Sequence, residues 1–342
     1  FQAEDGIRDF CLSRGLGDVY KRQDQNSPSP ALLISFGKVP ENWYWEAVRG
    51  EVRLEHREEE VNSFGITVLS HPDKWGIIGA SSAISWNPPI NHSWELIAWR
   101  KSHLVGTKRT VSKDSVMQLS ELFTDTFMNR DPTADKGIIA PRTPCPVLYG
   151  IRGASKEAVE SAHIWMQDVE TNEKCESWAS HMSNQLSDDH LLGPSFGTVI
   201  SDPRVVKGAH ASLRVISDGS GETLVAFSEG GPVNRLLRQL SPGDTVSWMG
   251  LRSPDKAIHL EKLKIVSASP RITTRPRCCG KAMRSKGKNQ DLSCDKCKMK
   301  TPKYWLSDEW SPDIPSSFDG WTQPPPSQRR HLSMPLELGI PS

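Results

Sequence analysis

The sequence predicts a multidomain α+β protein, and three observations lead to that prediction. Residues 196–266 contain five strand-like runs and one helix-like run, in the order of a small β-barrel. Residues 145–181 read strand, helix, strand, which is typical of a compact α+β unit. Two cysteine pairs lie between Cys278 and Cys297, as in a metal-stapled ribbon. A chain of 342 residues is long enough for several such units, each with its own core.

Residues 1–23 resemble a translated sequencing adaptor and not part of a folded domain. The stretch reads FQAEDGIRDFCLSRGLGDVYKRQ, and the chain begins without a methionine. We therefore leave this stretch and its Cys11 out of the fold prediction. We expect the natural protein to have further sequence on the N-terminal side of Asp24.

Residues 24–122 are predicted to form the first folded region. The apolar run at 31–36 predicts a strand, and Pro40 opens an amphipathic helical pattern. The stretch GIIGASSAI, which starts at Gly76, has a Gly-x-x-Gly spacing that fits a phosphate loop. Tight packing of a helix on a sheet is the interpretation we favour for it. A further strand is predicted at 93–100.

Residues 123–193 are predicted to form a small α+β sandwich of ferredoxin-like type. The run at 145–151 predicts a strand, Ser155 is a candidate helix cap, and 176–181 predicts a second strand. A possible earlier strand lies at 137–140. The apolar stripe of the helix comprises Val159, Ala162, Met166 and Val169.

Residues 194–270 have the strand order of an OB-fold barrel, whose open face commonly binds single-stranded nucleic acid. One helix, at 233–240, falls between the third and fourth strands. The predicted strands are 197–201, 209–217, 223–228, 245–249 and 258–266.

A zinc ribbon is predicted at 271–304. Cys294 and Cys297 form a Cys-x-x-Cys knuckle, but Cys278 and Cys279 are adjacent, and Pro276 stands where a matching knuckle needs cysteine. The fourth ligand is then either Cys278 or a residue from elsewhere. The alternative is a set of reduced, partly buried thiols.

Basic residues crowd the same stretch, although the whole chain has a formal net charge of only +1. A cationic surface on a small rigid ribbon suits a phosphate backbone, and a solvated surface is the alternative. The candidate RNA-binding residues are Lys281, Arg284, Lys286 and Lys288.

Cysteine use and hydropathy indicate the compartment. Four of the seven cysteines cluster and the others are scattered, which indicates metal ligands in a reducing environment and not a disulfide framework. No signal peptide is visible and no apolar run is long enough for a membrane span. We expect a cytoplasmic protein, with a Pro- and Trp-rich tail at 305–342 packed over the other domains.

From about Ser70 onwards the sequence resembles the archaeal tRNA-isoleucine 2-agmatinylcytidine synthetase family. The order and spacing of several motifs support the resemblance. They are GIIGASSAI, WELIAWR from Trp94, PVLYGIRG from Pro146, SNQLSDDHL from Ser183, SKGKNQDLSCDKC from Ser285 and PPPSQRRHL from Pro324.

The resemblance implies a kinase-like catalytic domain, a ferredoxin-like domain, an OB domain and a zinc ribbon. It also implies an ATP-dependent ligase that joins agmatine to the wobble cytidine of the CAU anticodon. Such chemistry needs carboxylates that hold magnesium against ATP. The family carries them in a Gly-Ile-Asp-Asp-Thr-Asp-Ser motif that this sequence lacks. We therefore expect 24–122 to be the C-terminal part of the catalytic domain, and this chain alone to be inactive.

Residue by residue, Arg152, Asn184 and Gln185 match family positions that the resemblance links to RNA or substrate. Met182 and Ser183 depart from it, because they stand where the family has arginine and threonine. Without the resemblance, the polar stretch 183–190 reads equally well as an ordinary loop. A non-enzymatic OB and ribbon protein that binds RNA is the main alternative function, and a DNA-handling protein of the same architecture is a weaker one.

Overall fold

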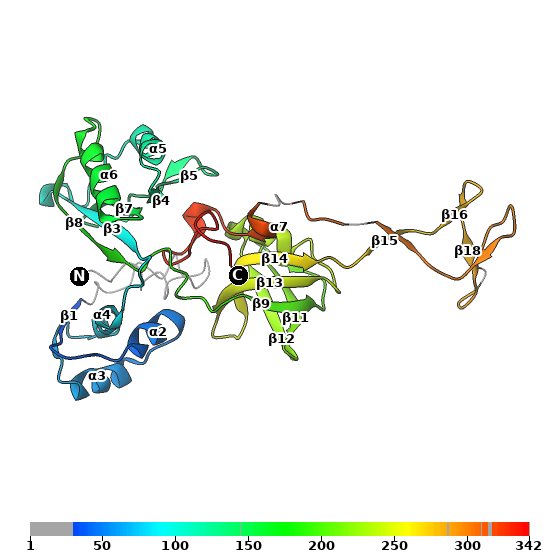
Figure 1. Cartoon of the computed structure of the whole chain (residues 1–342), viewed down its shortest axis with the longest axis horizontal. Helices are drawn as coiled ribbons and strands as arrows, with labels where there is room; N and C mark the ends of the chain where they lie inside the picture. The colour runs from blue at the N-terminus through cyan, green and yellow to red at the C-terminus, as the bar shows by residue number, and fades with distance from the viewer. Residues whose placement is uncertain (1–29, 144, 286, 309, 314–316, 342) are drawn as a thin grey trace.

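A computed structural model describes residues 30–143, 145–285, 287–308, 310–313 and 317–341. The molecule is elongated (Figure 1). Two α/β units lie at one end, a β-barrel occupies the middle, and a small ribbon lies at the far end of a two-stranded stalk. The predicted multidomain mixed α/β class is therefore correct. The adaptor-like stretch lies outside the described residues.

The first unit pairs two strands and covers one face of them with helices. Strand β1 (Ala31–Ile34) is antiparallel to β2 (Thr67–Ser70). The helices are α2 (Asn42–Arg49), α3 (Leu54–Ser63) and α4 (Gly76–Ser85). Leu33, Trp43 and Ile77 meet in the core between them. The Gly-x-x-Gly stretch is therefore the start of a packed helix, which agrees with the interpretation favoured from sequence.

The second unit is a four-stranded antiparallel sheet in the order β4-β7-β3-β8. Along the chain its elements alternate as strand, helix, strand, strand, helix, strand. They are β3 (Ser93–Arg100), α5 (Lys113–Leu122), β4 (Thr126–Phe127), β7 (Val147–Gly153), α6 (Lys156–Asp168) and β8 (Cys175–Ser183). A short η3 (Ser102–Leu104) and the hairpin of β5 (Arg130–Asp131) with β6 (Lys136–Gly137) complete it.

This sheet corrects two expectations. The strand at 93–100 and the residues up to 122 were assigned to the catalytic domain, but β3 is an inner strand here and α5 packs on the same core. The boundary at residue 122 is therefore wrong, because β3 pairs on both sides with later strands. The strand expected at 137–140 is also wrong, since β6 pairs with β5 and β4 takes the place in the sheet.

Helix α6 begins where the sequence predicted. The Ser155 hydroxyl accepts a hydrogen bond from the Ala158 amide at 3.1 Å, which satisfies one free N–H of the first turn. The predicted stripe is buried at Val159, Ala162 and Met166. Val169 follows the helix, because its backbone is already extended (ψ 118°).

Five strands close the central barrel in the circuit β9-β11-β12-β14-β13-β9. Strands β12 and β14 are parallel, and the other neighbours are antiparallel. The one α-helix lies between the third and fourth strands, as predicted. The elements are β9 (Ser195–Val199), β10 (Arg204–Val205), β11 (Ala211–Ser217), β12 (Ser220–Ala226), η4 (Ser228–Gly230), α7 (Pro232–Leu237), β13 (Thr245–Arg252) and β14 (Ile258–Ser267).

A stalk and a ribbon follow the barrel. The stalk pairs β15 (Arg271–Thr274) with β21 (Leu306–Asp308), so the first residues of the expected ribbon belong to the stalk. The ribbon is a hairpin packed beside a three-stranded sheet. Its strands are β16 (Arg277–Cys278), β17 (Lys281–Ala282), β18 (Arg284–Ser285), β19 (Leu292–Ser293) and β20 (Lys300–Thr301).

The C-terminal tail returns to the middle of the molecule (Figure 1). It contains η5 (Phe318–Gly320), β22 (Trp321–Thr322), which pairs with β14, and η6 (Pro326–Gln328). The Ser327 amide donates to the buried Asp131 carboxylate of the second unit at 3.0 Å. The tail therefore packs over the other units, as expected. Among the described residues, no helix is both long and apolar enough to span a membrane.

Candidate metal centre and nucleic-acid interface

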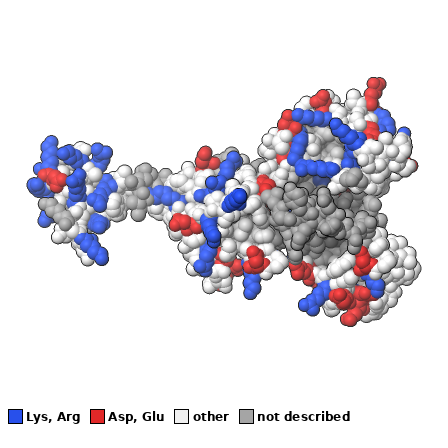
Figure 2. Space-filling view, turned by 180° about the vertical axis from the view of Figure 1, so that it is seen from behind, with Lys and Arg blue, Asp and Glu red and all other residues white. Residues whose placement is uncertain are grey.

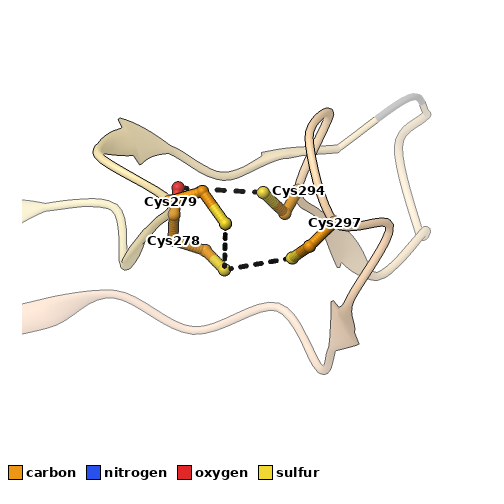
Figure 3. Close-up of side chains that lie close together, drawn as sticks. All are labelled: Cys278, Cys279, Cys294 and Cys297. Atoms are coloured by element: carbon orange, nitrogen blue, oxygen red, sulfur yellow. Dashed lines mark hydrogen bonds between the residues drawn. The ribbon is translucent and has the colours of Figure 1, made fainter.

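The ribbon brings four thiols together. Cys278, Cys279, Cys294 and Cys297 each present Sγ, and all four atoms lie within 4.8 Å of one another (Figure 3). The Cys278 sulfur is 3.4 Å from that of Cys297 and 3.9 Å from that of Cys279. Four sulfurs bound tetrahedrally at the usual Zn–S length of about 2.3 Å would lie roughly 3.8 Å apart. The cluster therefore has the size of a four-thiolate zinc site.

Local backbone geometry explains why adjacent cysteines can serve together. Cys279 and Gly280 have positive φ angles of 48° and 80°, so the chain turns back immediately after Cys278. On the other side, the Cys294 amide donates to the Met299 carbonyl at 3.0 Å, and the Lys298 amide to the Cys294 carbonyl at 2.9 Å. Cys278 Sγ therefore lies with the other three sulfurs, in a place where a fourth ligand atom could be supplied.

The thiols influence each other's ionisation. Backbone N–H groups of Cys297 and Lys296 lower the pKa of Cys294 to about 7. Hydrogen bonds with the thiols of Cys297 and Cys294 raise the pKa of Cys278 to about 12. The knuckle amides thus favour one thiolate, and further negative charge in the cluster is unfavourable without a cation. A divalent metal ion would supply the positive charge that stabilises further thiolates in the cluster.

Basic side chains cover the ribbon. Lys281, Arg284 and Lys288 are exposed, and Lys286 lies outside the described residues. Figure 2 shows Lys and Arg gathered over this end of the molecule, and also around a hollow on the upper of the two units at the broad end. The ribbon therefore presents a cationic surface beside its thiol cluster.

Arg152 does not extend into solvent towards a partner. It lies on the sheet of the second unit, with Nε 3.6 Å from the Glu95 carboxylate and Nη2 2.7 Å from Nδ1 of His331. Burial raises the pKa of Glu95, but His181 and Arg152 lower it, and the net pKa lies below the ordinary value. The guanidinium thus links the sheet to the C-terminal tail.

Asn184 and Gln185 also lie at this joint between units. Gln185 Nε2 donates to Glu95 at 2.6 Å, and Asn184 Nδ2 donates to the hydroxyl of Tyr44 at 3.1 Å. The Tyr44 hydroxyl in turn donates to Asp189 at 2.6 Å. The structure therefore brings these two amides close to Arg152. The basic ribbon is a separate part of the chain.

A second polar network connects the segment that follows Gln185 to the barrel. His190 Nε2 lies 3.0 Å from the Glu261 carboxylate, which also accepts from Arg330 at 2.7 Å and from Ser333. Burial raises the pKa of Glu261, but these cationic and hydroxyl partners outweigh it and lower the pKa to about 2. Sequence reasoning missed Glu261 because a glutamate in an alternating strand looks like an exposed residue. In the sequence, only the motif that contains Arg330 marked one of the partners of Glu261.

Comparisons with known proteins agree with this architecture. The sequence model of the TiaS FLD domain matches residues 74–190, a range that includes α4 of the first unit and all of the second unit. The tRNA-isoleucine 2-agmatinylcytidine synthetase TiaS of Methanocaldococcus jannaschii is 34% identical over 316 residues, covering 87% of this chain and 72% of that protein.

Solved structures are similar as well. The complex of TiaS with its isoleucine tRNA and ATP has a TM-score of 0.74 at 28% identity, over 87% of this chain and 72% of that one. The complex of TiaS with the same tRNA, AMPCPP and agmatine has a TM-score of 0.72 at 27% identity, over 87% and 72% of the two chains. The chain therefore belongs to the tRNA-isoleucine 2-agmatinylcytidine synthetase family.

Proposed function

We propose that this protein takes part in joining agmatine to the wobble cytidine of an isoleucine tRNA, in a reaction driven by ATP. The single observation that carries the proposal is the match over 87% of the chain to relatives with that activity in their name. The structure adds a thiol-stapled ribbon with a basic surface, which suits the phosphate backbone of a tRNA. Such a substrate would place the protein in the cytoplasm.

In this proposal the units that the structure describes hold the tRNA, and no magnesium- or ATP-binding role is assigned to their residues. Two observations support this division. The sequence contains no Asp-Asp-Thr-Asp motif. The outer face of β1 and β2 exposes Leu32 opposite Leu69, with Ile34 beside them, and Leu69 is 60% exposed. Exposed apolar side chains grouped on one face of a small sheet are typical of an interaction surface.

Strand order supports the names that we propose for the second unit and for the barrel. A strand, helix, strand, strand, helix, strand order with the sheet order β4-β7-β3-β8 supports a ferredoxin-like sandwich for the second unit. The closed circuit of five strands, with α7 between the third and fourth, supports an OB-fold for the barrel. These labels support an RNA-handling role only by analogy of fold.

A structural zinc completes the ribbon. Four cysteine sulfurs this close together fit zinc, and Met283, Leu292 and Cys294 form too small a core to hold the ribbon without it. When bound, zinc would fix the positions of the surrounding lysines and arginines. The polar atoms of Arg152, Asn184 and Gln185 would position the units against each other around the tRNA.

Binding and turnover test the proposal separately. The purified zinc-loaded chain is titrated with a labelled transcript of the isoleucine tRNA with the CAU anticodon at several salt concentrations, with single-stranded DNA of equal length as competitor. We expect salt-sensitive binding in which the tRNA wins. Labelled agmatine, ATP and tRNA are then incubated with the chain, and no incorporation is expected. Turnover would refute the division of roles, and preference for DNA would refute the function.

A further inference from the structure

Trp305 and Trp45 share an arrangement in which an arginine covers one face of an exposed indole ring. The guanidinium carbon of Arg275 lies 5.0 Å from the ring centroid of Trp305, and that of Arg49 lies 4.1 Å from the ring centroid of Trp45. Trp305 is 43% exposed and Trp45 is 39% exposed. In both places the arginine holds the ring in one orientation and leaves aromatic surface in contact with water.

The charge around the two rings differs. Trp305 stands where the stalk meets the ribbon, after Lys300 and Lys303, and its neighbour Tyr304 is 45% exposed. Trp45 lies on α2 beside α3, whose exposed residues include Glu55 and Glu59. Acidic side chains are prominent on the lower unit in Figure 2, whereas the ribbon end is basic. Of the two rings, Trp305 therefore lies in the surroundings that attract a polyanion.

We propose that Trp305, with Tyr304 beside it, is a stacking platform for unpaired bases of RNA, such as the single-stranded end of a tRNA. This inference rests on the proposed function, and it specifies that Trp305 and Tyr304 bind unpaired RNA. Every base has a π-face, so an aromatic platform binds single strands with little dependence on sequence. The lysines nearby neutralise the phosphates that follow each stacked base.

The ring is prepared for this role before RNA arrives. Arg275 already stacks on one face, so the indole has little rotational freedom left to lose when a base packs on its remaining surface. Arg275 also lies between the paired stalk strand β15 and the first ribbon strand β16, where the backbone is held on both sides. Stacking at Trp305 would thus fix an unpaired strand at a defined point along the stalk.

The test compares two RNA probes. The zinc-loaded chain is titrated by fluorescence anisotropy with a single-stranded RNA of about eight nucleotides, a length near the site size of such platforms, and with a blunt, G·C-rich RNA duplex of about the same length in base pairs. Variants are Trp305→Ala, Trp305→Leu and Trp305→Phe, with Trp45→Ala as the matched control. Zinc content is measured for each variant, so that loss of the ribbon fold is recognised.

Trp305→Ala and Trp305→Leu should weaken binding of the single strand roughly 5- to 100-fold, the loss that one stacked base accounts for. The salt dependence should not change, because no charge is removed. Trp305→Phe should restore most of the affinity, and Trp45→Ala should bind as the wild type does. Tyr304→Ala is the second variant if a Trp305 variant loses zinc.

Unchanged single-strand affinity in Trp305→Leu and Tyr304→Ala would overturn the platform while leaving tRNA binding by the basic ribbon intact. An equal loss for the duplex would overturn it too, because stacking requires unpaired bases. If the wild-type chain bound neither these probes nor the isoleucine tRNA, the proposed function itself would fall.

Discussion

Arg271 and Asp244 form a two-point ion pair that ties the stalk to the barrel. Nη1 and Nη2 of the arginine each lie 2.8 Å from one carboxylate oxygen of Asp244, which is fully buried. The same carboxylate accepts from the Ser241 and Ser269 amides at 2.8 Å. The base of the stalk is therefore held as part of the barrel, so the ribbon beyond it projects in a defined direction.

Replacing Arg271 by methionine should lower the free energy of unfolding of the barrel by about 1.5–3 kcal/mol. Two charge-assisted hydrogen bonds are lost, and Asp244 keeps only its amide and hydroxyl donors. Denaturant unfolding, followed by tryptophan fluorescence, measures the change. Arg275→Met is the control on the same stalk, and it should stay within about 0.5 kcal/mol of the wild type. Equal effects of the two substitutions would mean that the pair does not stabilise the barrel.

Glu261 should make stability depend on acid pH. Its folded pKa of about 2 lies below the ordinary value of 4.5, so its contribution is fully present above pH 4.5 and is lost as the pH falls towards 2. The full shift corresponds to about 3 kcal/mol, of which about 1.4 kcal/mol should be lost by pH 3.5. Denaturant unfolding at pH 6, 4.5 and 3.5 measures the difference between wild type and Glu261→Gln.

That difference should shrink as the pH falls, because the glutamine variant has no carboxyl at this position to titrate. Glu222→Gln is the matched control in the same barrel, since its partner Arg252 is exposed and the pair should contribute at most about 1 kcal/mol. A difference between wild type and Glu261→Gln that stayed constant from pH 6 to 3.5 would contradict the assigned pKa.

The barrel could be predicted because its signal is local. Ala211, Leu213 and Val215 alternate with polar residues along one strand, and all three are buried. The partners of β3 could not be predicted in the same way. Glu95 pairs with Arg152 and with His181, which lie 57 and 86 residues further along, and alternation within a strand does not show which strands lie beside it.

The residues at the joint between the units show a second limit of prediction from sequence. Asn184 and Gln185 are polar residues in a short linker, and their amides would look the same in sequence whether they bound RNA or the side chains of Tyr44 and Glu95.

The metal site shows a third limit of prediction from sequence. The spacing predicted three ligands, but the positive φ of Cys279 that brings Cys278 into the cluster is a property of the folded turn.

Cys278 and Cys279 should both be needed for tight metal binding. Cys278→Ser and Cys279→Ser should each weaken zinc affinity by more than the roughly 10- to 100-fold that loss of an outer-shell partner costs. Competition with a chromophoric chelator measures the affinity. Cys145→Ser is the control, because its thiol lies beside Arg109 in the second unit. If Cys278→Ser bound zinc as tightly as the control, the fourth ligand would have to come from another residue.

The basic ribbon should account for much of the salt dependence of tRNA binding. Alanine at Lys281, Arg284, Lys286 and Lys288 removes four positive charges, and each lost phosphate contact should reduce the slope of log affinity against log salt by about 0.7–0.9. Titrations of the isoleucine tRNA at several salt concentrations measure the slope. The matched control exchanges lysine and arginine at the same positions, which keeps the charge, and should retain both affinity and slope. An unchanged slope in the alanine variant would show that these side chains are exposed to water and contact no phosphate. The reason is that losing a phosphate contact must change the number of counterions released on binding.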